Sequence, residues 1–188
     1  MTEQEFYKFV HRRLAQISIG PSAIRNQGAS GLISTLRNYF EEQIDLDIFI
    51  SSLYDNSTYK EFLNYHTNKI LDLFPVTAQS WGAARKGLNL FLREIVYSKF
   101  FSSRFSIPDN FDEFNNFIKA MEVPLDKDVA KGIIKDSLNK NLKWQNIKRL
   151  TPHSSEEFQN EALIIAGKEN IARVNLDVKY WRPSNKIN

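Results

Sequence analysis

The stretch Ser80–Glu94, SWGAARKGLNLFLRE, joins a small-residue segment, an Arg-Lys pair and a long apolar face. Apolar side chains continue past its end and recur at intervals of three and four residues, which is the period of one helix face. They are Leu88, Phe91, Leu92, Ile95, Val96 and Phe100. This spacing predicts a long buried helix from Gly82 to about Phe101, and we expect that helix to be the centre of the fold.

Further amphipathic helices are predicted on both sides of this segment. Apolar residues follow helical spacing within 6–17, 29–40 and 58–74, and again within 111–121, 126–138 and 154–167. Residues 174–180 instead alternate apolar and polar side chains, which is typical of a strand and predicts an extended C-terminal tail. The expected fold class is predominantly α, as one compact multi-helix domain over residues 1–188. The sequence is also compatible with two lobes in this domain. One would comprise about 1–75 with the C-terminal part, and the other about 76–140.

Composition excludes several classes of site. Hydrophobic residues are 42% of the chain and charged residues 25%, which is typical of a globular protein rather than a disordered one. Cysteine is absent and the three histidines are scattered, so we expect no disulfide, no metal site and no cofactor. The N-terminus lacks a signal pattern and no window is long and apolar enough to span a bilayer. We therefore expect a cytoplasmic protein with no membrane partner.

The charge is unevenly distributed along the chain. The formal net charge is +3, and the excess of basic residues lies in 76–188. Several basic side chains between 127 and 149 are spaced to share helix faces: Lys127, Lys131, Lys135, Lys140, Lys143, Lys148 and Arg149. Such a distribution favours a polyanionic partner, although an ordinary solvated surface has the same pattern.

Two short segments resemble motifs of the helix-hairpin-helix DNA glycosylase superfamily, which includes endonuclease III. Gly82 to Lys86 is similar to the hairpin of that family, in which small residues precede an Arg-Lys pair that opens a long apolar helix. Leu125 to Val129 is similar to the family segment in which an apolar residue and an aspartate open a later helix. The resemblance covers about the middle third of the chain and implies a helix-hairpin-helix.

The resemblance implies two catalytic residues, Lys86 and Asp126. An unprotonated lysine amine can attack the anomeric carbon of a flipped nucleotide and form a Schiff base. A carboxylate in the same pocket stabilises the positive charge that develops on the sugar, or activates a water molecule. Each residue also fits a simpler interpretation, because Lys86 suits the solvated face of an amphipathic helix and Asp126 is a good N-cap.

The resemblance also implies a set of DNA contacts. Free amides at the start of a helix bind a phosphate, and small side chains let the backbone approach it. A glutamine in a separate segment of the family fills the gap that the extruded base leaves. The residues assigned to DNA binding are Trp81, Gly82, Ala83, Ala84, Arg85 and Gln27.

Together these motifs imply a small monomeric DNA glycosylase, with or without lyase activity at abasic sites. Its partner would be double-stranded DNA with a damaged or modified base, which is flipped into a cleft before its N-glycosidic bond is cut. Two alternatives are open from the sequence. One is a non-catalytic helix-hairpin-helix DNA-binding module, and the other is a helical interaction protein, such as a defence component, whose aromatic helices dock a partner.

Overall fold

The computed structural model describes residues 1–24 and 27–181, and every regular element in these two ranges is helical. In chain order the elements are α1 (Glu3–Ile17), α2 (Leu32–Gln43), α3 (Leu46–Ser52), α4 (Asn56–Leu73), η1 (Val76–Ala78), α5 (Trp81–Tyr97), α6 (Lys99–Phe105), α7 (Phe111–Phe117), α8 (Lys127–Asp136), η2 (Ile147–Arg149), α9 (Pro152–Lys168), η3 (Arg173–Asn175) and α10 (Leu176–Tyr180). The predominantly α class is confirmed. No helix in the described part is long and apolar enough to cross a membrane.

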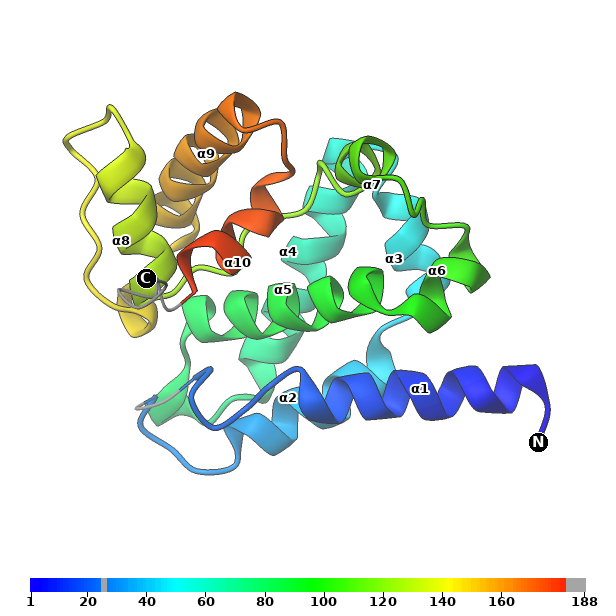
Figure 1. Cartoon of the computed structure of the whole chain (residues 1–188). Helices are drawn as coiled ribbons and strands as arrows, with labels where there is room; N and C mark the ends of the chain where they lie inside the picture. Colours follow the sequence, from blue (N-terminus) through cyan, green and yellow to red (C-terminus); the bar gives the residue numbers. More distant parts are fainter. Residues whose placement is uncertain (25–26, 182–188) are drawn as a thin grey trace, which may run out of the picture.

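Helix α5 is the structural centre of the molecule (Figure 1). It contacts α1, α2, α4, α6, α9 and η2. Because neighbours surround it, 12 of its 17 residues are buried, including the charged pair Arg85 and Lys86. Its start is fixed by Ser80, whose hydroxyl accepts a hydrogen bond from the Ala83 amide at 3.2 Å. The connection of residues 74–80, which includes η1, joins α5 to α4, and the two helices pack against each other.

The long central helix ends four residues earlier than the apolar spacing predicts. Ser98 has an extended conformation between α5 and α6, with φ −77° and ψ 120°. Its amide bonds the Ile95 carbonyl at 3.2 Å, and its carbonyl accepts the Phe101 amide at 3.0 Å. The break redirects the chain so that Phe101 is 1% exposed while Phe100 lies outside. Apolar residues on two successive helices therefore mimicked one continuous face.

The prediction of an extended tail is wrong for residues 174–180, which form parts of η3 and α10. The buried residues of this segment are Val174, Leu176, Asp177 and Tyr180, whereas Val178 is exposed. Leu176 and Tyr180 fit both the alternating period of a strand and the period of a helix. Their apolar character therefore could not distinguish a strand from a helix. Residues 182–188, the rest of the predicted tail, lie outside the described residues.

Buried apolar side chains form two clusters, and Ala172 and Val174 of the last part of the chain belong to the first of them. The first is built mainly from α1 to α7, and the second from residues 123–180, which include α8, α9 and α10. The first cluster crosses residue 75, the expected boundary between lobes, because α4 and α5 pack together. The start of α5 also contacts the second cluster through Trp81, so this helix joins the two cores.

Candidate functional site

Lys86 and Asp126 lie next to each other although 39 residues separate them in the sequence. The Lys86 ammonium is 3.2 Å from Oδ2 of Asp126 and donates a second hydrogen bond to the Ala23 carbonyl at 2.9 Å. Lys86 is in the second turn of α5 and is only 7% exposed. The interpretation of Lys86 as a residue of the solvated helix face is therefore wrong, because its side chain is buried where α5 meets the loop after α1.

Asp126 divides its two carboxylate oxygens between two tasks. Oδ1 accepts hydrogen bonds from the amides of Asp128 at 2.9 Å and Val129 at 3.0 Å, which caps α8 as the sequence predicted. Oδ2 faces Lys86. The cap fixes the direction of the carboxylate, because both amides belong to the first turn of the helix. Asp126 is thus both the N-cap of α8 and the partner of Lys86.

Both side chains line one open cavity of about 510 Å³. The loop after α1 supplies Ser18, Gly20, Ser22 and Ala23, and the other walls come from α5, the start of α8 and the α10 segment. In Figure 1 the blue loop, α8 and α10 surround the first half of α5. A cavity of this size falls in the range of small-molecule sites and has room for one nucleobase and its sugar.

A second ion pair, between Arg93 and Asp177, also lines this cavity. Arg93 lies two turns after Lys86 on α5, and its guanidinium contacts the carboxylates of Glu94 and Asp177. Asp177 is 5% exposed, so this carboxylate is compensated inside the protein. Neither residue was predicted from the sequence. Arg93 was identifiable, since seven residues after Lys86 is the same helix face, whereas Asp177 lies in the segment that we expected to be extended.

Two aromatic side chains complete the cavity. Tyr97 and Trp181 line it and are 40% and 63% exposed. Burial raises the pKa of Tyr97 above its usual value, and the hydroxyl donates a hydrogen bond to Asn175. Aromatic faces at the opening of a polar cavity suit the stacking of a planar base.

The small-residue start of α5 differs from the exposed turn that the resemblance implies. Gly82, Ala83 and Ala84 are all buried in the first turn of the helix. A Cβ atom at Gly82 would lie 2.2 Å from the Ile147 carbonyl oxygen and 2.7 Å from Cβ of Leu150. The segment around η2 therefore covers these residues. Glycine is needed at 82 for this close approach of two chain segments.

The other residues assigned to DNA binding are also inside the protein or turned away from the Lys86 cavity. Arg85 is 5% exposed and its guanidinium lies over the Trp81 ring, 4.8 Å from the centroid, on a different side of α5 from Lys86. Gln27 is 3% exposed. Lys143, Lys148 and Arg149 are exposed, and the Lys148 amine lies beside Gly28.

Comparison of the chain with protein-family models, with curated proteins and with solved structures gives no match. The described residues contain no group of three or more His, Asp or Glu side chains placed to hold a metal ion. The chemistry of the site is therefore argued from Lys86, Asp126 and the cavity that they share.

Proposed function

We propose that the protein is a DNA glycosylase that removes a damaged or modified base and forms a Schiff base through Lys86. One observation carries the proposal: two residues that the resemblance pairs as nucleophile and carboxylate lie 3.2 Å apart on the wall of one open cavity. Lys86 lies on α5 and Asp126 caps α8, and α6 and α7 lie between these two helices, so local sequence does not bring the residues together. Packing of the whole fold does.

The geometry supplies the parts of a covalent reaction. The Lys86 amine must first lose a proton, and Oδ2 of Asp126 is within hydrogen-bond distance to accept it. Nζ then bonds to C1′ of the flipped nucleotide while the glycosidic bond breaks and its electron pair leaves with the base, which takes up a proton. The C1′–O4′ bond then breaks as the nitrogen lone pair forms the C=N bond, and the second proton of the amine goes to O4′, which gives the protonated imine. Asp126, once ionised again, stabilises the cationic intermediate.

The same cavity has features that suit a base and a DNA strand. Trp181 and Tyr97 offer aromatic faces to the extruded base, and the loop of residues 18–23 contributes small polar groups around its edge. The phosphate contacts of the proposal belong to the exposed cations Lys143, Lys148 and Arg149 rather than to the buried start of α5.

The test is reductive trapping with borohydride on duplex DNA that contains an abasic site. The wild-type protein should form a covalent complex, and Lys86→Ala should form none while it keeps the helical circular dichroism of the wild type. Lys127→Ala is the matched control, because Lys127 is an exposed lysine next to Asp126 that does not line the cavity. Trapping that survives in Lys86→Ala, or is lost in Lys127→Ala, would contradict the assignment of the nucleophile.

A non-catalytic DNA-binding module is the second candidate. The contacts of Lys86 favour it, because hydrogen bonds to the Asp126 carboxylate and to the Ala23 carbonyl give the side chain a structural role. This candidate predicts salt-dependent binding to duplex DNA. It also predicts that a panel of duplexes with damaged bases shows neither base release nor trapping, whereas the glycosylase releases at least one of those bases.

A further inference from the structure

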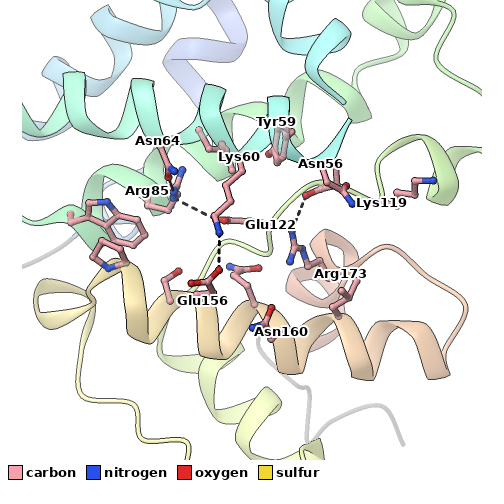
Figure 2. Close-up of a pocket in the computed structure, with 17 residues that line it drawn as sticks. Asn56, Tyr59, Lys60, Asn64, Arg85, Lys119, Glu122, Glu156, Asn160 and Arg173 are labelled. Atoms are coloured by element: carbon pink, nitrogen blue, oxygen red, sulfur yellow. Dashed lines mark hydrogen bonds and ion pairs between the residues drawn. The ribbon is translucent and has the colours of Figure 1, made fainter. Parts of the chain in front are cut away.

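A second cavity lies on another side of α5, between α4 and α9 (Figure 2). Its volume is about 370 Å³ and none of its lining residues is shared with the Lys86 cavity. Arg85 and Lys86 are neighbours in the sequence, yet each lines a different cavity, since successive helix residues point about 100° apart. The proposed glycosylase chemistry makes no use of this second space.

Arg85 enters the second cavity as a buried and incompletely paired cation. Its side chain is 6% exposed, and Nε is 3.5 Å from the Glu122 carboxylate. One terminal nitrogen, Nη2, donates to Asn64, and the other, Nη1, has no hydrogen-bond partner among the described residues. Glu122 is shared, because it also accepts a hydrogen bond from Asn89. A buried guanidinium nitrogen without an acceptor is costly, so Nη1 would gain from one more acceptor oxygen.

Two more cations around the cavity lack a carboxylate partner within the described part of the chain. Arg173 donates to the backbone carbonyls of Ala120 and Met121 at 2.9 and 3.0 Å, which leaves its charge uncompensated. Lys119 is exposed and makes no ion pair there.

The acidic side chains that line the cavity are already engaged. Glu122 forms an ion pair with Arg85. Glu156 pairs with Lys60 at 2.7 Å across the space between α9 and α4 (Figure 2). Lysine and arginine therefore outnumber the two carboxylates around this space.

We propose that this second cavity binds a phosphate group, with Arg85 as its central ligand. Arginine presents parallel donors that match the oxygens of phosphate, and the surplus of positive charge suits an anion. Tyr59, Leu63 and Trp81 are among the other residues that line the cavity, and its volume leaves room for an organic group attached to the phosphate. The phosphate belongs either to a free nucleotide-sized molecule or to a DNA strand.

The experiment titrates the protein with inorganic phosphate at constant ionic strength and follows the thermal unfolding temperature, with chloride as the reference anion. A ligand that binds only the folded state raises the unfolding temperature in a saturable manner. Arg85→Met should weaken the apparent affinity by about tenfold or more, because a charge-assisted hydrogen bond is lost. A linear rise that is equal for phosphate and chloride would overturn the proposal, and so would unchanged affinity in Arg85→Met.

A second pair of variants decides the matter if Arg85→Met does not fold. Lys119→Gln should weaken phosphate binding by about threefold, because it removes an exposed charge next to the cavity. Lys131→Gln removes an equally exposed lysine from α8, outside both cavities, and should leave the affinity unchanged. Equal effects of the two substitutions would refute the site. A 5′-mononucleotide that binds more tightly than inorganic phosphate identifies a free ligand, whereas duplex DNA that displaces phosphate identifies the strand.

Discussion

Replacing Asp126 by asparagine should destabilise the protein even though asparagine caps helices as well as aspartate does. The reason is that the two carboxylate oxygens of Asp126 accept hydrogen bonds from different donors. One oxygen accepts the amides of Asp128 and Val129, and the other accepts the Lys86 ammonium. Asparagine has one side-chain oxygen, so it can serve the helix or the lysine but not both. If it caps α8, its NH₂ group faces the ammonium with donor against donor.

The expected magnitude follows from the burial of the pair. The Lys86 side chain is 8% exposed and that of Asp126 is 28% exposed, so the contact lies between a surface pair and a fully buried one. A hydrogen bond to a charged group contributes about 1.5–3 kcal/mol, and we expect Asp126→Asn to lower the free energy of unfolding by about 2 kcal/mol. Asp126→Ala removes the cap as well and should cost about 1 kcal/mol more.

Urea unfolding followed by far-UV circular dichroism measures these differences, and a double-mutant cycle isolates the pair. In Lys86→Met the carboxylate of Asp126 still accepts two amide hydrogen bonds and is partly hydrated. That variant should therefore lose less stability than Asp126→Asn. In the Lys86→Met background, Asp126→Asn should be close to neutral. The coupling energy between the two positions is then about 1.5–2 kcal/mol.

Two results would refute this reasoning. A coupling energy below about 0.5 kcal/mol would show that the ion pair contributes no more than a surface pair. Equal stability of Asp126→Asn and Asp126→Ala would show that the amides of Asp128 and Val129 do not depend on the side-chain oxygen. The cycle also bears on function, because Lys86→Met should remain folded and yet form no trapped complex with abasic DNA.

Further measurements test the packing and the pH dependence. Gly82→Ala should lower the free energy of unfolding by on the order of 3 kcal/mol, because a Cβ atom would lie 2.2 Å from the Ile147 carbonyl oxygen. Gly167 also lies in a helix, but a Cβ atom there would meet no other atom within 4 Å. Gly167→Ala should therefore stabilise the protein by about 0.5–1 kcal/mol in the same urea experiment. Burial lowers the pKa of His66 from 6.5 to about 4, and its ring is bonded to the Tyr39 hydroxyl. Since the unfolded chain takes up the proton first, stability should fall as the pH drops from about 6.5 towards 4, by at most about 3 kcal/mol, and a urea series across this range should show a smaller fall for His66→Gln.

The helical class and the place of α5 followed from the sequence because apolar residues at three- and four-residue spacing reflect burial directly. The N-cap of α8 followed from Asp126, which is a local signal. The break at Ser98 did not follow, since two helices that bury one core continue the same apolar period. The segment around Tyr180 was misassigned for a related reason: positions 176 and 180 fit a period of two and a helical turn equally well.

The composition of the Lys86 cavity was only partly accessible from the sequence. Lys86 and Asp126 were identified through a resemblance, and Arg93 lies on the same face of α5 and was available from helix geometry. Asp177 and Trp181 were not, because their place beside α5 depends on how the chain returns after α9. The burial of the α5 start has the same origin, since it depends on the segment around η2, over 60 residues further along the chain.

Helix α5 separates two cavities, and its adjacent cations Arg85 and Lys86 each line one of them. A helix at the centre of a core gains most free energy from apolar side chains, and two adjacent buried cations work against that gain. Each cation is tolerated because it lies at the wall of a cavity and meets a carboxylate there, Glu122 for Arg85 and Asp126 for Lys86. The two sites therefore share one helix but none of the other groups that line them. It follows that substitutions at 85 and 86 should act independently on phosphate binding and on covalent trapping.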